Sequence, residues 1–117
     1  MAEQAIIDMP TYNQLKELMG ADFIAELIDT YNIETTALIE QLGLALTSAD
    51  AVLFGRSAHS IKSSSASLGA FTLSQQAREL EMMGKANDLL GADNKLQLLS
   101  SEFLQVKQCL EALRDES

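Results

Sequence analysis

The chain has 117 residues, 47% of them hydrophobic, and a formal net charge of −9. This length allows one domain, and the apolar content is too high for a disordered chain. The acidic charge excludes a general binder of nucleic acid or of an anionic membrane, and the single cysteine and single histidine exclude an internal disulfide and an ordinary zinc site.

The first predicted helix is short, over residues 12–19, with Thr11 as its N-cap and Gly20 directly after it. A long helical pattern follows from Asp22. Its core residues recur at steps of four and three, which places them on one face; they are Ile24, Ile28, Tyr31, Thr35, Leu38, Leu42 and Ala45. Gly43 lies inside this pattern and lowers helix propensity, so we expect fraying near it.

A break at residues 47–50 precedes the third predicted helix, which spans 51–68. Ser48 or Asp50 can cap it, because both side chains accept hydrogen bonds from the free N–H groups of a first turn. Gly69 closes it, as glycine commonly does after the last turn of a helix.

Two further helices are predicted in the second half of the chain. Thr72 or Ser74 opens the fourth helix, Gly84 and Gly91 weaken its end, and Asp93 caps the last helix. The fourth helix has a short apolar stripe and the last helix a longer one. These stripes contain Leu73, Ala77, Leu80 and Met83, and then Leu96, Leu99, Phe103, Val106, Leu110 and Leu113.

Four amphipathic helices joined by short loops predict an all-α fold, an antiparallel up-down four-helix bundle with a short extra N-terminal helix. One domain is expected over 1–117. Each stripe lasts only a few turns and is used by one core, so a monomer is expected.

No region is typical of a secretory signal or a membrane span. The first ten residues have no basic stretch and no long apolar run, and no segment approaches ~18 consecutive apolar residues. We therefore expect an intracellular protein, cytoplasmic or nuclear, and assign it to the cytoplasm.

The histidine, His59, lies on the face of the third helix that points away from the core. At about 100° per residue, it is about 140° from the centre of a stripe formed by Phe54, Ala58, Ile61, Ser65 and Leu68. Its neighbours on its own face are small or cationic, and they are Gly55, Arg56, Lys62, Ser63 and Ala66. We expect an exposed imidazole that a flat partner surface can reach.

The charge pattern around His59 is lopsided. From Ala51 to Arg78 the chain has no Asp or Glu, whereas Arg56, Lys62 and Arg78 are three of its eight basic residues. This locally positive window favours a negatively charged group attached to, or bound beside, the imidazole.

The segment Ala58-His59-Ser60-Ile61-Lys62-Ser63-Ser64-Ser65-Ala66-Ser67-Leu68-Gly69-Ala70 resembles the signature of the histidine-containing phosphotransfer (HPt) domain of two-component phosphorelays. The match covers thirteen consecutive positions, and the helix count and order agree with it over the whole chain. In that family a phosphoryl group moves between an aspartate of a receiver domain and the Nε2 atom of an exposed histidine. The resemblance therefore implies a phosphorelay intermediate.

The resemblance also assigns roles to single residues. It makes His59 the phospho-accepting residue and Lys62 the cation that steadies the phosphoryl oxygens. The family often has glycine where this chain has Ser63, which keeps the position small and adds a hydroxyl. An ungapped alignment places Glu81 where several members, including chemotaxis-kinase domains, hold the histidine ring; the plain alternative for Glu81 is a solvated helix residue. Arg78, one turn earlier, is expected to line the same face.

The resemblance implies response-regulator receiver domains and an upstream sensor histidine kinase as partners. We expect them to dock around His59, on Val52, Gly55, Arg56, Ala66 and Arg78 and on parts of the second helix. No cofactor is expected on this chain, which lacks a Gly-rich phosphate loop; Mg²⁺ is expected on the receiver domain. The chain is then a phosphocarrier and not an enzyme.

Two other functional classes remain open. The pairs Ser63–His59 and Cys109–His59 allow a serine hydrolase or a cysteine peptidase, although no oxyanion hole is evident. The second alternative is a non-catalytic helical-bundle adaptor, in which His59 is only a surface residue.

Overall fold

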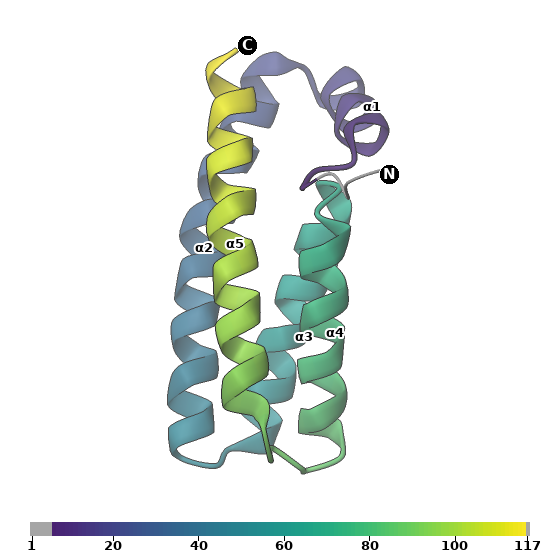
Figure 1. Ribbon diagram of the computed structural model, residues 1–117. Coiled ribbons are helices and arrows are strands. Elements are labelled where there is room, and N and C mark those ends of the chain that lie inside the picture. The colour runs from purple at the N-terminus through teal and green to yellow at the C-terminus, as the bar shows by residue number, and fades with distance from the viewer. Residues whose placement is uncertain (1–5, 117) are drawn as a thin grey trace.

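The computed structural model describes residues 6–116 and contains five helices: α1 (Met9–Met19), α2 (Ala21–Thr47), α3 (Ala51–Ser67), α4 (Phe71–Lys85) and α5 (Ala92–Asp115). Successive helices from α2 to α5 run in opposite directions and form a four-helix bundle, while α1 lies at the end where α3 meets α4 (Figure 1). The predicted all-α bundle with a short extra N-terminal helix is confirmed. Of the single domain predicted over 1–117, residues 1–5 and 117 lie outside the described part.

Aspartate side chains cap α1 and α3. Asp8 accepts hydrogen bonds from the backbone N of Thr11 at 3.2 Å and from its Oγ1 at 2.6 Å. The prediction of Thr11 as the cap is therefore wrong, because α1 begins one turn earlier, at Met9. At α3, Asp50 accepts from the backbone N of Leu53 at 3.1 Å, which selects it from the two caps that the sequence allowed.

The start of α4 differs from the prediction. The helix begins at Phe71, ahead of both predicted caps, Thr72 and Ser74, and its N-cap residue Ala70 makes no side-chain hydrogen bond. Ser74 is used differently, because its hydroxyl donates to the carbonyl oxygen of Lys62 on α3 at 2.8 Å. Packing against α3 has thus replaced local capping at this end.

Two further details of the helix ends also differ. Gly91, with φ of 78°, is the N-cap of α5, so Asp93 lies inside the first turn, where its charge still favours the positive end of the helix dipole. In α2 the low propensity of Gly43 does not interrupt the helix, which continues to Thr47. Packing of the long apolar stripe outweighs the low propensity of one glycine.

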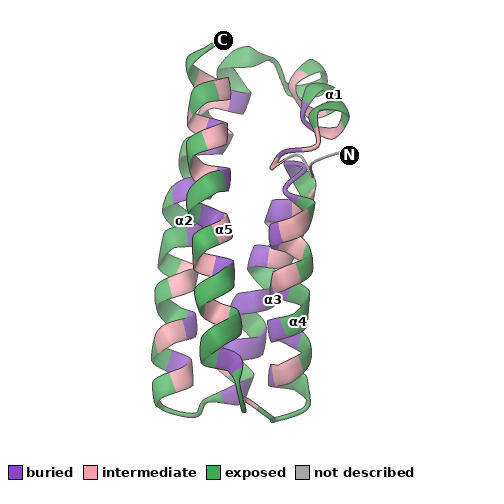
Figure 2. Cartoon of the chain, in the orientation of Figure 1, coloured by how far each residue is buried: buried purple, intermediate pink, exposed green. Residues whose placement is uncertain are grey.

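The four stripes meet in one core (Figure 2). Most of their predicted members are fully buried, and Leu38, Met83, Leu96 and Leu113 are partly buried at the edge of the cluster. Each bundle helix packs against two neighbours, because α2 contacts α3 and α5, and α4 contacts the same two helices.

The α3–α4 hairpin determines which residues of the two helices face each other. Its tight turn contains Gly69, whose φ of 90° suits glycine, and Gly69 O accepts from the backbone N of Asp8 at 2.9 Å. At ~1.5 Å per residue, His59 lies about 12 Å before the end of α3 and Glu81 about 15 Å after the start of α4. The two side chains are therefore opposite each other.

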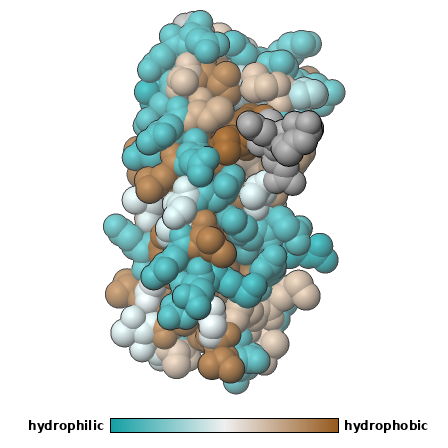
Figure 3. Space-filling model, in the orientation of Figure 1, coloured by the Kyte–Doolittle hydropathy of each residue, from teal (hydrophilic) through white to brown (hydrophobic). Residues whose placement is uncertain are grey.

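The outer surface is mixed, and each of the five helices exposes at least one large apolar side chain. On the face shown in Figure 3, hydrophilic side chains dominate the middle of the bundle, and apolar side chains gather toward its two ends. Within residues 6–116, no helix is long and apolar enough to cross a bilayer.

Candidate functional site

The imidazole of His59 projects from α3 into solvent, with 58% of its side chain exposed. The opposite face of the same helix is buried, and Phe54, Ala58 and Ile61 are fully inaccessible. The predicted orientation of the histidine away from the core is confirmed.

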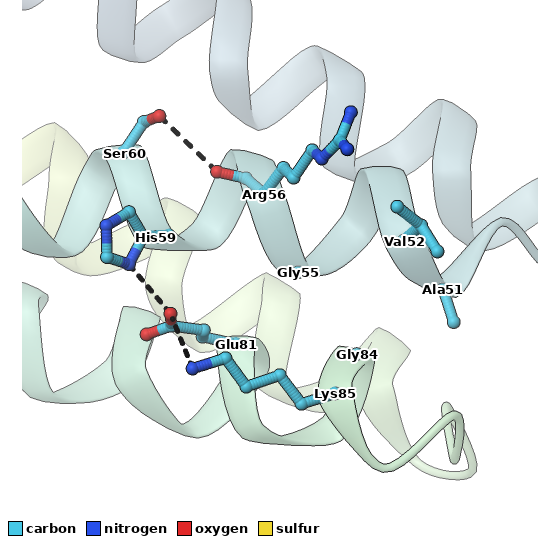
Figure 4. A pocket seen from close by; sticks show the side chains of 9 residues that line it. All are labelled: Ala51, Val52, Gly55, Arg56, His59, Ser60, Glu81, Gly84 and Lys85. Atoms are coloured by element: carbon cyan, nitrogen blue, oxygen red, sulfur yellow. Dashed lines mark hydrogen bonds and ion pairs between the residues drawn. The ribbon is translucent and has the colours of Figure 1, made fainter.

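Glu81 of α4 holds the ring from below (Figure 4). Its Oε2 lies 2.7 Å from Nδ1 of His59, and its side chain is only 5% exposed. Of the two alternatives for this residue, the solvated one is therefore wrong. The hairpin register brings the carboxylate under the ring, as described above.

Two lysines neutralise the buried carboxylate. Lys62 Nζ lies 2.6 Å from Oε1, and Lys85 Nζ lies 3.3 Å from Oε2. These partners, above all the hydrogen bond from Lys62, lower the pKa of Glu81 to about 2, although burial acts in the opposite direction. Glu81 is thus ionised at neutral pH.

This charge state determines the tautomer of His59. An ionised carboxylate has no proton to donate, so the hydrogen atom in the 2.7 Å contact belongs to Nδ1. In the neutral ring the lone pair then lies on Nε2, the nitrogen on the far side from Glu81. The site presents a fixed, accessible nucleophile.

An open depression lies beside the ring, between the first half of α3 and the end of α4. Figure 4 shows the residues that line it: Ala51, Val52, Gly55, Arg56, His59, Ser60, Glu81, Gly84 and Lys85. Its floor is made by the two glycines, and its rim carries the exposed side chains of Val52 and Arg56.

The structure brings together only part of the predicted site. Val52 and Arg56 are exposed at the depression, as the predicted partner surface requires. Gly55 also lines it but is buried, with Gly84 directly against it, so it serves helix packing more than access to the ring.

Besides Lys62, three other predicted residues lie outside this depression. Ser63 and Arg78 are exposed, and Ala66 is half-buried. None of them is among the residues that line it. Arg78 was expected to line the same face as Glu81, but only Glu81 lines the depression.

Lys62 is positioned differently from the expectation. Its side chain is 30% exposed, and its ammonium group is bound to Glu81 and not held free beside the ring. In this arrangement its direct effect is on the carboxylate that orients the histidine.

Sequence reasoning missed Lys85 and Gly84. Lys85 follows Glu81 by four residues, a spacing at which opposite charges meet on a helix. The sequence therefore contained the signal for this ion pair. Gly84 was interpreted only as a residue that weakens the helix. Its contact with Gly55 is long-range, and no local pattern indicates it.

Among the described residues, no cluster of three His, Cys, Asp or Glu side chains could hold a metal ion. Cys109 is partly buried in α5 against the core. It is not among the residues around His59, so the geometry gives no support to a cysteine peptidase.

An exposed histidine on a four-helix bundle, with its Nδ1 bound to a buried carboxylate, is the arrangement that the resemblance to histidine phosphotransfer domains led us to expect. Comparison with known proteins agrees: the model of the Hpt domain family matches residues 26–116. The chain belongs to this family and is a histidine phosphotransfer intermediate of two-component phosphorelays.

Two known proteins illustrate the relationship. The crystal structure of histidine-containing phosphotransfer protein B (HptB) from Pseudomonas aeruginosa matches with a TM-score of 0.93 and 26% identity, over 98% of this chain and 99% of that chain. The sensor protein TorS of Escherichia coli is 32% identical over 75 residues, which are 64% of this chain and 8% of TorS. The chain thus corresponds to a small part of the length of TorS.

Proposed function

We propose that Nε2 of His59 accepts the phosphoryl group from a receiver-domain aspartate or a kinase and passes it to the aspartate of another receiver. The observation that carries this assignment is the geometry of one ring: Nδ1 is bound to Glu81 at 2.7 Å while most of the side chain is exposed. This combination leaves one nitrogen both nucleophilic and reachable.

The transfer step needs little from this chain. The lone pair of Nε2 forms a bond to phosphorus as the bond from phosphorus to the aspartyl oxygen breaks, and the aspartate leaves as a carboxylate. The ring gains positive charge, and the ionised Glu81 stabilises it through the proton that stays on Nδ1. The reverse step, to another receiver, uses the same contacts.

We assign most of the catalysis to the partner. Mg²⁺, carried by the receiver domain, would neutralise charge on the phosphoryl oxygens. This chain is then a phosphocarrier that orients and presents a nucleophile, and it is not an enzyme by itself.

Around the ring, the proposed contacts fall into two groups. Lys62 is bound to Glu81 in the free protein. We propose that it contacts a phosphoryl oxygen once one is attached, and that the hydroxyl of Ser63, which is exposed, does the same. Val52, Arg56, Ala66 and Arg78 form the remainder of the proposed receiver surface. The apolar Val52 together with the cationic Arg56 and Arg78 suits a modest, transient interface with an acidic partner site.

The partners in this proposal are response-regulator receiver domains and an upstream sensor histidine kinase. We place the chain in the cytoplasm, where the ATP that such kinases use is available. We propose that it acts as a monomer, since its apolar stripes are occupied in one core.

The test is to mix the chain with a receiver domain carrying radioactive aspartyl phosphate in the presence of Mg²⁺. Transfer is expected to give protein-bound phosphate that is stable in alkali and lost in acid. His59→Gln keeps a polar side chain of similar length, and it should take up no label while its circular dichroism remains that of the parent.

Equal labelling of His59→Gln and the parent would disprove the assignment. Ser101→Ala is the matched control, because Ser101 is an exposed serine on α5, a helix that contributes no residue to the depression beside His59. This variant should be labelled as fast as the parent.

A further inference from the structure

Helices α3 and α4 pack on each other more extensively than any other pair, and their backbones meet at Gly55 and Gly84. This contact lies one turn from the functional pair, since Gly55 precedes His59 by four residues and Gly84 follows Glu81 by three. In Figure 4 the two glycines lie along the same helices as the ring and the carboxylate.

The two glycines differ in how much room they have. A Cβ atom added to Gly84 would lie 2.7 Å from both Cα and N of Gly55, and 2.8 Å from the carbonyl oxygen of Ala51. All three atoms belong to the backbone, so no side chain can rotate away to make room. A Cβ atom added to Gly55 would meet its nearest neighbour, Cα of Gly84, at 3.6 Å, which is ordinary contact.

A side chain at position 84 would therefore move the helices apart. Carbon atoms pack best at about 3.5–4.0 Å, so a contact of 2.7 Å requires a separation of about 1 Å. The bond between Nδ1 of His59 and Glu81 is 2.7 Å long and lies one turn away. Lengthened by ~1 Å, it would exceed the range of a hydrogen bond.

We propose that Gly84 is a positioning residue, whose missing side chain sets the α3–α4 separation at which Glu81 holds the proton on Nδ1 of His59. The effect on phosphotransfer rests on the proposed function, whereas the effect on the tautomer does not. In this role Gly84 has no side chain to offer a ligand; it acts through Glu81.

The first experiment measures the tautomer of His59 by long-range ¹H–¹⁵N NMR in the full chain, without a partner. The parent and Gly55→Ala should both show Nδ1–H as the dominant form. Gly84→Ala should show a mixture with Nε2–H, because the contact that favours one tautomer has been lost. A folded Gly84→Ala with the tautomer of the parent would overturn the proposal.

The second experiment is a double-mutant cycle on the rate of phosphoryl transfer from a phosphorylated receiver. Glu81→Ala removes a charge-assisted hydrogen bond and should slow transfer roughly 10- to 100-fold. Gly84→Ala should slow the parent by a similar factor and slow Glu81→Ala by less than about twofold. Independent, multiplicative effects would show that Gly84 does not act through Glu81.

If Gly84→Ala does not fold, a bulky side chain at Gly55, on the opposite helix α3, tests the same proposal. Gly55→Val puts branched carbons against Gly84 and the Glu81 carbonyl oxygen, which are only 3.6 and 3.7 Å from a Cβ atom at position 55. This variant should lose the Nδ1–H preference that Gly55→Ala keeps. Retention of the preference in folded Gly55→Val would contradict the proposal.

The outcomes also separate this inference from the proposed function. If Gly84→Ala loses the preference of His59 for the Nδ1–H tautomer, the positioning role is supported. If the parent protein takes up no phosphate, the phosphocarrier assignment is rejected. Normal uptake by a folded Gly84→Ala that keeps the parent tautomer rejects only the role of Gly84.

Discussion

Glu81 is a buried carboxylate that stays charged because three donors surround it. Burial alone would raise its pKa, but the contacts from Lys62, His59 and Lys85 outweigh that cost and lower the pKa to about 2. Its ionised form is what makes His59 keep its proton on Nδ1. The chemistry of an exposed ring therefore depends on a group that solvent barely reaches.

Lys62 has the largest influence on the pKa of Glu81. Lys62→Gln should raise the pKa of the Glu81 carboxyl from about 2 toward its ordinary value of 4.5, since the 2.6 Å charged contact is lost. A ¹³C NMR titration of the glutamate carboxyl carbons measures this. Lys85→Gln is the matched control, with a smaller expected rise because its contact is longer, 3.3 Å, and its side chain is 73% exposed.

The same shift predicts how stability depends on pH. The pKa of Glu81 is lower in the folded than in the unfolded chain, so its contribution is complete above pH ~4.5 and is lost as the pH falls toward about 2. In Lys62→Gln this contribution should be smaller throughout. Urea unfolding at a series of pH values would detect it, and an identical acid dependence in both proteins would contradict the ion pair.

At the scale of elements, the long helix α2 shows how packing overrides local propensity. Gly43 costs helix stability on its own, yet α2 continues through it to Thr47. Its neighbours Leu42 and Ala45 are fully buried, so the core holds the helix on both sides of the glycine. The penalty is still present in the total stability.

Gly43→Ala should therefore raise the free energy of unfolding by up to about 1 kcal/mol. No atom outside the local helix backbone lies within 4 Å of an added Cβ atom, so the gain in propensity meets no clash. Chemical denaturation measures this change. No gain in stability would show that the glycine has another role.

Gly69→Ala is the contrasting substitution in the α3–α4 turn. Its φ of 90° and a Cβ position 2.9 Å from the carbonyl oxygen of Asp8 both oppose a side chain. This variant should lower stability, by about 1 kcal/mol or more. Glycine is thus dispensable in α2 and required in the turn that fixes the site's register.

At the scale of the whole molecule, charge is unevenly distributed. The net charge is −9, but the segment from Ala51 to Arg78 has no acidic residue, and it contains His59. All 17 acidic residues, but only five of the eight basic ones, lie outside this segment. The field should therefore favour encounters at the histidine face.

Arg56→Gln should reduce the association rate with a phosphorylated receiver at low salt by roughly two- to fivefold, and weaken the dependence of that rate on ionic strength. Stopped-flow measurements across a salt series test it. Lys107→Gln is the matched control, because it removes the same charge from the face between α2 and α5. If both substitutions reduce the association rate equally, the net charge of the protein, and not the position of Arg56, determines the rate.

Periodic patterns made the bundle predictable. The apolar stripes repeat with the helix period, and a helix can bury such a stripe only against other helices. The helix ends were less predictable: Thr11, Thr72 and Asp93 were all plausible caps, yet Asp8, Ala70 and Gly91 hold those positions. Several polar residues near the start of a helix can each serve as its N-cap, and the packing of the whole helix determines which residue occupies that position.

By itself the sequence determined that this chain is a helical bundle and that its histidine faces solvent, because both follow from the spacing of residues along single helices. Only the tertiary structure decided that Glu81 is buried beneath the ring, that Lys62 and Lys85 share its charge, and that Gly84 lies against Gly55. These contacts join α3 to α4 across a turn. Their geometry depends on how closely two helices pack, a distance that no pattern within one helix contains.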